Sequence, residues 1–103
     1  MKRVERRVRA SDDIDEAVAH YIEVASADVA ERFLLEYEGA VEHIARHPGT
    51  CSRRYVQVLD GAELRFWTLN RFPYAVFYVE RADVIDVVRV LHQASDIPAQ
   101  LEN

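Results

Sequence analysis

The sequence predicts an α+β domain in which a short N-terminal strand, a two-helix hairpin and a four-stranded antiparallel meander follow one another. Three observations predict it: a helical apolar period over residues 11–47, a change to strand-like composition after Pro48, and short connections between the later segments. A sheet covered on one face by a helical hairpin buries both apolar surfaces. With 103 residues there is room for one core, so we expect a single domain over residues 1–103.

The chain opens with a segment in which two sets of residues alternate. These sets are Val4, Arg6 and Val8 against Arg3, Glu5, Arg7 and Arg9. The pattern predicts a charged strand over residues 3–9, either at a sheet edge or pairing across a dimer. Ser11, Asp12 and Asp13 then predict a helix start, because a hydroxyl or carboxylate caps free backbone N–H groups and acids suit the positive end of the helix dipole.

Two amphipathic helices are predicted next. Apolar residues recur at a spacing of three to four over residues 14–25 and again over residues 29–44. Residues 26–28 break the first pattern and supply a second cap. Residues 47–49, His-Pro-Gly, end the second helix, because proline cannot continue a helix and glycine tolerates the left-handed cap. Helices joined by so tight a turn form a hairpin.

The predicted strands of the meander cover residues 54–59, 63–69, 74–80 and 84–91. Their short connections favour antiparallel pairing. The last strand is apolar on both faces, which predicts a central or well-covered place in the sheet. Its predicted faces are Ile85, Val87, Arg89 and Leu91 on one side, and Val84, Val88 and Val90 on the other. The tail after residue 96 is expected to form one helical turn or none.

The net charge of −5 and the sequence pI of about 5.3 argue against nucleic-acid binding, which usually needs a basic surface. We interpret the basic residues at 2–9 and at 53–54 as solvated faces. The single cysteine, Cys51, is interpreted as a reduced thiol. The chain has neither a run of 18 apolar residues nor the apolar segment of a signal peptide, so we predict no membrane segment and a cytoplasmic location.

Two patterns resemble metal sites only superficially. The acids of residues 12–16 lack the central glycine and distal glutamate of a calcium loop. His43 and His47 stand four apart, but Ile44 occupies the place of the glutamate in a metalloprotease helix, and no third ligand is evident. We therefore predict no metal, no cofactor and no catalytic residue.

Several segments, taken in order, resemble the ParE/RelE superfamily of bacterial toxins. The segment from Ala30 through Ile44 to the His-Pro-Gly stop is similar to the family's long helix and its exit. Residues 71–78, Arg-Phe-Pro-Tyr-Ala-Val-Phe-Tyr, are similar to its Phe-Pro-Tyr strand, and residues 88–98 to its closing strand. The resemblance covers nearly the whole chain. It implies the family's fold and a toxin of the kind found in plasmid-stabilisation systems.

The superfamily has two main chemistries. RelE-like members cut mRNA on the ribosome with basic residues on central strands plus an Arg and a Tyr near the C-terminus. This chain has Ala75 where those nucleases carry an Arg, and Gln57 and Leu59 on the preceding strand in place of lysines. Residues 93–95, Gln-Ala-Ser, stand where a basic run would be, and no Tyr follows Tyr78. The resemblance therefore implies the ParE-like branch, whose members block DNA gyrase.

Three polar residues in or beside apolar strands remain as candidate partner-binding or structural residues: Arg65, Arg89 and His92. A buried guanidinium demands a carboxylate or several carbonyls. The candidates for that acid are Asp86, Glu63, Glu80 or an acid of an antitoxin. His92 ends the last strand, where a ring N–H could hold a turn carbonyl.

Three hypotheses follow. The first is a ParE-like toxin bound by a cognate antitoxin whose C-terminal segment wraps the helices and sheet edge, as a homodimer or a toxin–antitoxin heterotetramer. A neighbouring gene should then encode a protein with a DNA-binding domain and a disordered tail. The second is a RelE-like mRNA interferase, and the third is a non-toxic orphan that keeps only the fold.

Overall fold

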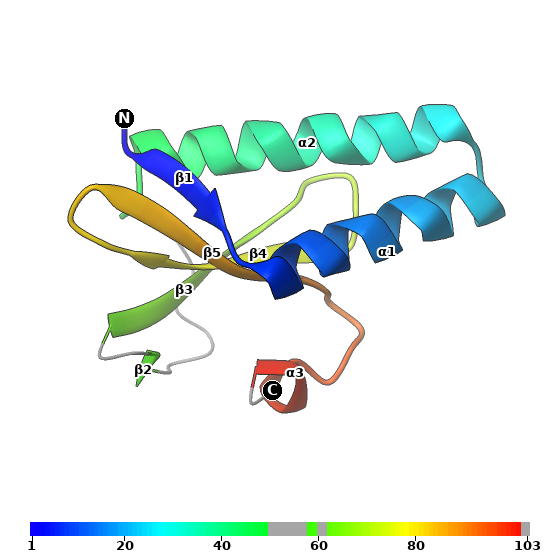
Figure 1. Ribbon diagram of the computed structural model, residues 1–103. Helices are drawn as coiled ribbons and strands as arrows, with labels where there is room; N and C mark the ends of the chain where they lie inside the picture. Colours follow the sequence, from blue (N-terminus) through cyan, green and yellow to red (C-terminus); the bar gives the residue numbers. More distant parts are fainter. Residues whose placement is uncertain (50–57, 60–61, 102–103) are drawn as a thin grey trace.

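The computed structural model describes residues 1–49, 58–59 and 62–101 (Figure 1). A strand, two helices, four strands and a short last helix follow one another, which confirms the predicted fold class. Residues 54–57 of the predicted meander lie outside the described residues. The elements are β1 (Arg3–Arg6), α1 (Val8–Val24), α2 (Ala27–Arg46), β2 (Val58–Leu59), β3 (Ala62–Thr68), β4 (Tyr74–Glu80), β5 (Val84–His92) and α3 (Ile97–Leu101).

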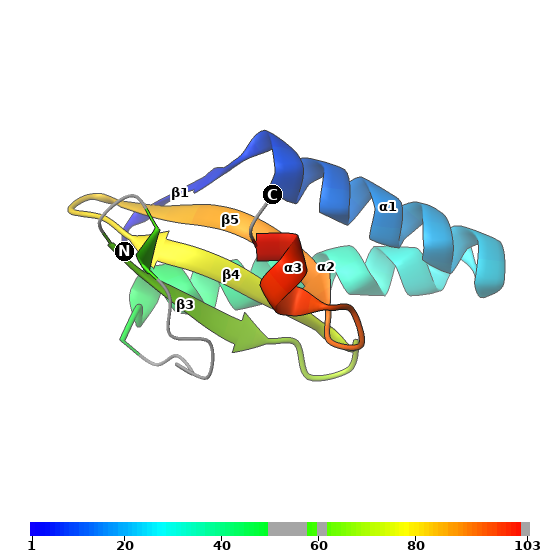
Figure 2. The ribbon, with the colours of Figure 1, turned by 90° about the horizontal axis from the view of Figure 1, so that it is seen from below.

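The strands form one sheet in the order β1-β5-β4-β3-β2. Strands β2 to β5 pair antiparallel as a meander, and β5 has neighbours on both sides, as its apolar faces predicted. Strand β1 lies at an edge and pairs parallel with β5, from Arg3 opposite Val84 to Arg6 opposite Val87. Figure 1 shows α1 and α2 on one side of the sheet, and Figure 2 shows α3 on the opposite side.

Helix α1 begins at Val8, so the predicted strand to residue 9 and helix start at Ser11 are wrong. The N–H of Arg7 donates to the Val87 carbonyl at 3.0 Å, and the Arg7 carbonyl accepts from the Ser11 N–H at 3.0 Å. One residue therefore ends the ladder of β1 and starts the hydrogen bonding of α1. No side chain caps this helix, and Asp13 lies within it.

Helix α2 begins and ends where the sequence predicts. The Ser26 hydroxyl accepts the Val29 N–H at 3.2 Å, which satisfies a backbone donor that the first turn leaves free. The helix ends at Arg46, before Pro48. None of the described helices is long and apolar enough to span a membrane.

A register shift changes the faces of β5. Tyr78 stands opposite Val87 and Phe77 opposite Arg89, so Val88 is the extra residue of a β-bulge. Before the bulge, Val87 faces the helices; after it Val90 does, and Leu91 joins Val88 on the opposite face. The predicted grouping of Leu91 with Val87, and of Val90 with Val88, is therefore wrong, because the extra residue reverses the alternation.

Each face of the sheet carries its own apolar core. The helical hairpin packs on one face through residues that include Phe33, Tyr37 and Ile44, all nearly inaccessible to solvent. The tail forms the short helix α3, whose buried Ile97 belongs to the core on the other face. The sheet residues of that second core are Leu64, Phe66, Ala75, Phe77, Val79, Val88 and Leu91.

Candidate functional site

Arg89 forms a buried ion pair with Asp13 of α1. Its Nε lies 2.7 Å from Asp13 Oδ2, and its second terminal nitrogen lies 2.9 Å from Oδ1, in a bidentate arrangement. The same carboxylate accepts the Val90 N–H at 3.0 Å. The remaining Arg89 nitrogen donates to the Gln100 carbonyl of α3 at 2.9 Å. Arg89 thus ties helices on both sides of the sheet to β5.

The acids that the sequence suggests as partners of Arg89 do not include Asp13, which the sequence pattern assigns to a helix start. Asp86, Glu63 and Glu80 bond to other cations. The hydrogen bond that the Arg89 guanidinium donates to Asp13 raises the pKa of Arg89, while burial opposes the rise. The signal that sequence reasoning missed is the placement of Asp13 one turn before Ala17, on the inner face of a helix that starts at Val8.

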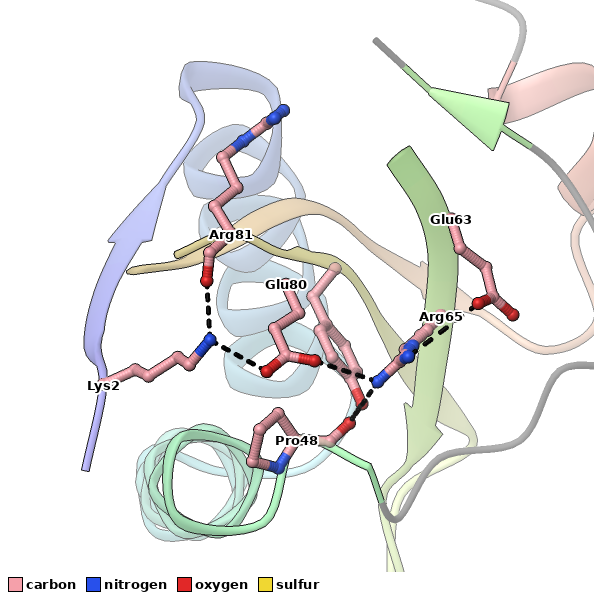
Figure 3. Close-up of polar contacts among 7 residues, drawn as sticks. Lys2, Pro48, Glu63, Arg65, Glu80 and Arg81 are labelled. Atoms are coloured by element: carbon pink, nitrogen blue, oxygen red, sulfur yellow. Dashed lines mark hydrogen bonds and ion pairs between the residues drawn. The ribbon is translucent and has the colours of Figure 1, made fainter. Parts of the chain in front are cut away.

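Arg65 of β3 belongs to a second polar cluster, at the end of the sheet where α2 stops (Figure 3). It donates to Glu80 at 3.1 Å and to the Pro48 carbonyl at 3.0 Å, and it lies 3.8 Å from Glu63. The acids predicted for such an arginine included Glu63 and Glu80, which these contacts confirm for Arg65. The other Glu80 oxygen lies 2.8 Å from the Lys2 ammonium.

Four further hydrogen bonds complete this end of the molecule. The Tyr78 hydroxyl donates to the Pro48 carbonyl at 3.0 Å, and Lys2 also donates to the Arg81 carbonyl at 2.6 Å. Asp86 accepts from Arg7 at 2.9 Å and from Arg81 at 3.1 Å. The hydrogen bond from Arg7 lowers the pKa of Asp86, burial opposes it, and Arg81 adds to the lowering.

His92 lies at the end of β5, half-buried beside the Tyr74 ring at a centroid distance of 5.1 Å. Its Nδ1 accepts the Ala94 N–H at 2.9 Å. The prediction that its ring holds a turn carbonyl is wrong, because the ring is the acceptor of a backbone donor and the His92 carbonyl bonds to Ser95. His92 therefore has a turn-closing role.

The sheet face that carries Ala75 is apolar. Ala75 is 2% exposed and packs among the second core beneath α3. Gln93 and Ala94 are exposed in the turn that follows β5, and Ser95 is half-buried there. Gln57 lies outside the described residues, as do Cys51, Arg53 and Arg54, whereas Leu59 is in β2. Arg89 of β5 stands opposite Phe77 of this face, and its guanidinium is engaged by Asp13.

A pocket of about 310 Å³ lies beside the Asp13–Arg89 pair, between α1, the end of β5 and the segment that leads into α3. Burial raises the pKa of Tyr74 in its wall, and the nearby Tyr21 and Glu16 add to the rise. Glu16 and His20 of α1 are exposed at this pocket. It is lined by Asp13, Glu16, Ala17, His20, Tyr74, Arg89, Val90, Leu91, His92, Ser95 and Gln100.

The His43–His47 pair is a ring contact in this structure, with centroids 5.3 Å apart, and His43 also lies over Trp67 at 4.6 Å. Over residues 1–49, 58–59 and 62–101, no group of three or more His, Cys, Asp or Glu side chains is placed to hold a metal ion.

Comparison with known proteins agrees with this architecture. The family profile of the ParE toxin of the type II toxin–antitoxin system parDE matches residues 4–97. A solved structure of the chromosomal ParDE TA system from P. aeruginosa is similar, with a TM-score of 0.73 and 18% sequence identity over 89% of this chain and 96% of that chain. At that identity the likeness shows the fold alone. No curated protein sequence matches.

Proposed function

Because the chain belongs to the ParE toxin family of type II toxin–antitoxin systems, we propose that it is the toxin of such a pair and acts by binding a protein. The target that the ParE-like resemblance implies is DNA gyrase. A cognate antitoxin binds the toxin in the cytoplasm and blocks this contact. Cleavage of RNA is not part of the proposal.

The observation that carries this proposal is the engagement of the sheet arginines with carboxylates. Arg89 is only 6% exposed and is held by Asp13 in two hydrogen bonds, and Arg65 is shared between Glu80 and the Pro48 carbonyl. RNA cleavage needs cations directed at the charge that develops on phosphorus. Arginines that are already paired with carboxylates cannot supply this charge without breaking their pairs.

The surface of the helical hairpin supports binding to a protein. Ile22 and Val24 at the end of α1 are 54% and 62% exposed, and Leu35 of α2 is 60% exposed. A pocket of about 470 Å³ lies beside Leu35, with Phe72 in its wall and Arg32 and Arg71 among its lining residues. Exposed apolar side chains gathered with arginines are typical of protein–protein interfaces.

Growth after induction tests the proposal. The chain alone should arrest a bacterial host, and co-expression of the neighbouring gene should restore growth. Arrest without relief by the neighbour would contradict the antitoxin pairing. Normal growth, with the protein purified in folded form, would favour the non-toxic orphan.

The target is tested with purified protein. Added toxin should inhibit supercoiling by DNA gyrase, and antitoxin added first should prevent the inhibition. Transcripts mapped by primer extension after induction should stay intact. Cleaved transcripts together with normal gyrase activity would replace the proposal with the RelE-like mRNA interferase.

A further inference from the structure

Strand β5 has a free edge beyond the end of β1. The two strands pair only from Val84 to Val87, whereas β5 continues to His92. The last bond of that ladder is the one from the Arg7 N–H to the Val87 carbonyl, after which the chain turns into α1. Beside the last residues of β5, the described sheet has no neighbouring strand on this side.

A side chain occupies part of this edge. The Asp13 carboxylate accepts the Val90 N–H at 3.0 Å. It takes the place that a backbone carbonyl would have if β1 continued along β5. Arg89 holds that carboxylate in place through two hydrogen bonds. The Val90 donor is therefore already satisfied, and an incoming strand cannot use it without displacing a buried ion pair.

Two backbone groups of the edge remain directed outward. The Gln93 N–H donates to the Pro73 carbonyl, toward β4, and Leu91 stands opposite Ala75 of β4. Because alternate residues of a strand direct their backbone groups to opposite sides, those of Val90 and His92 point away from β4. The His92 carbonyl is taken by the N–H and hydroxyl of Ser95. The Val90 carbonyl and the His92 N–H are left.

This donor–acceptor pair matches a parallel neighbour. In a parallel ladder one residue donates to the residue before its partner and accepts from the residue after it, as Arg3, opposite Val84, donates to the Asp83 carbonyl. An antiparallel neighbour would bond to both the N–H and the carbonyl of one residue, either Val90 or His92. The Val90 N–H and the His92 carbonyl are already engaged, so neither residue can form such a pair. The edge is thus prepared for a strand that runs in the direction of β5.

The space and charge beside this edge define the occupant. The pocket of about 310 Å³ lies along Val90 to His92, with α1 on one side and Ser95 and Gln100 on the other. That volume is at the small end of ligand sites, about 300–1000 Å³, and suits a short extended segment. Asp13 is neutralised by Arg89, so Glu16 gives the pocket a net negative charge when its histidines are neutral.

We propose that this pocket binds an extended segment of the antitoxin, which pairs parallel to β5 through the Val90 carbonyl and the His92 N–H and places a lysine or arginine beside Glu16. The inference rests on the proposed function, because it assigns the antitoxin as the occupant. Beyond the proposed function, the inference specifies the edge of β5 as the binding place of the antitoxin segment. It also specifies a parallel direction and a basic side chain for that segment.

Amide hydrogen exchange of the isotope-labelled toxin, free and in complex with the full-length antitoxin, tests the backbone contact. The His92 amide should exchange about tenfold or more slowly in the complex, because it gains a hydrogen bond. The Val90 amide serves as internal control: it should be protected in both states, since Asp13 already accepts from it. A tight complex in which His92 exchanges as in the free toxin would overturn the inference and leave the proposed function standing.

A pair of charge reversals tests the side-chain contact. Glu16→Lys should weaken antitoxin binding about three- to fivefold, the range of an exposed ion pair. Asp15→Lys makes the same change in net charge on the neighbouring exposed residue, which does not line the pocket, and should leave affinity within about twofold. Equal effects of both variants would contradict the basic contact. Failure of the antitoxin to bind the unaltered toxin would overturn this inference and the proposed pairing together.

Discussion

The two arginine centres of the sheet differ in how many carboxylates share the charge of the guanidinium. Arg89 is 6% exposed and has one carboxylate, that of Asp13, itself 9% exposed, beside the Gln100 carbonyl. The Arg65 side chain is 17% exposed and is shared among Glu80, Glu63 and the Pro48 carbonyl. A buried charge with one counter-ion makes the fold depend on that counter-ion, whereas a charge near water with several counter-ions tolerates the loss of one.

The largest expected effect comes from Asp13→Ala, which leaves the Arg89 charge buried and unpaired. Unfolding in urea should show a loss of about 3–5 kcal/mol in the free energy of unfolding. Asp13→Asn keeps an acceptor and should lose less. The matched control is Asp12→Ala, an exposed neighbour on the same helix, for which we expect a change within about 0.5 kcal/mol. Equal stability of the two alanine variants would abolish the contrast between the centres.

The exposure of Asp86 lies between that of the Arg89 centre and that of the Arg65 centre, since its side chain is 15% exposed. Two arginines, Arg7 and Arg81, share its charge. Its folded pKa is below the unfolded value of about 3.9, so its stabilisation is present above that pH and is lost as pH falls through the lowered pKa. Asp86→Asn should cost about 2 kcal/mol at pH 7. The difference from the unaltered protein should shrink below pH ~4 in urea titrations at several pH values. A constant difference down to pH ~2 would contradict this assignment.

Tyr78→Phe removes one donor from the Pro48 carbonyl, which keeps its bond from Arg65. The ring stays in the core, so we expect a loss of about 1 kcal/mol, the net value of one neutral hydrogen bond. Urea denaturation at pH 7 measures it. A loss above about 3 kcal/mol would mean that the Arg65 centre depends on a single contact as strongly as the Arg89 centre does.

The smallest expected effect is that of Glu80→Gln, which keeps a hydrogen-bond acceptor between Lys2 and Arg65 while removing the charge. The loss should be about 0.5–1 kcal/mol at low salt and should diminish toward 1 M salt, because these charges lie near water. Glu42→Gln, in the exposed pair with Arg46, is the control and should change stability less. If the stability lost in Glu80→Gln did not depend on salt, the Glu80 charge would be shielded from water like the buried Asp13–Arg89 pair.

Much of the fold followed from local patterns. The Ser26 cap and the Pro48 stop set the bounds of α2, and the short connections predicted the antiparallel meander, which the structure confirms for β2 to β5. The start of α1 was predicted wrongly. Ser11 has the residue type of a helix cap, but the helix begins earlier, directly after Arg7 bonds to Val87. That bond joins segments that are distant in the sequence, so local patterns do not predict it.

The candidate site was only partly predictable. Arg65 was expected to pair with Glu63 or Glu80, which lie on the same and the adjacent strand, and it does. The predicted partners of Arg89 were wrong because its acid lies 76 positions away along the chain. The roles expected for Gln57 and for the arginines at 53–54 stay predictions, since those residues are outside the described part.

By itself the sequence determined the order of the elements, their approximate bounds, the absence of nuclease-type cations at Ala75 and the family to which the chain belongs. These depend on residue type and on spacing within one helix or strand. Tertiary structure alone decided the Asp13–Arg89 pair, the bulge at Val88 and the edge pocket at His92. Each of these depends on which distant backbones lie side by side, and local periodicity carries no information about that.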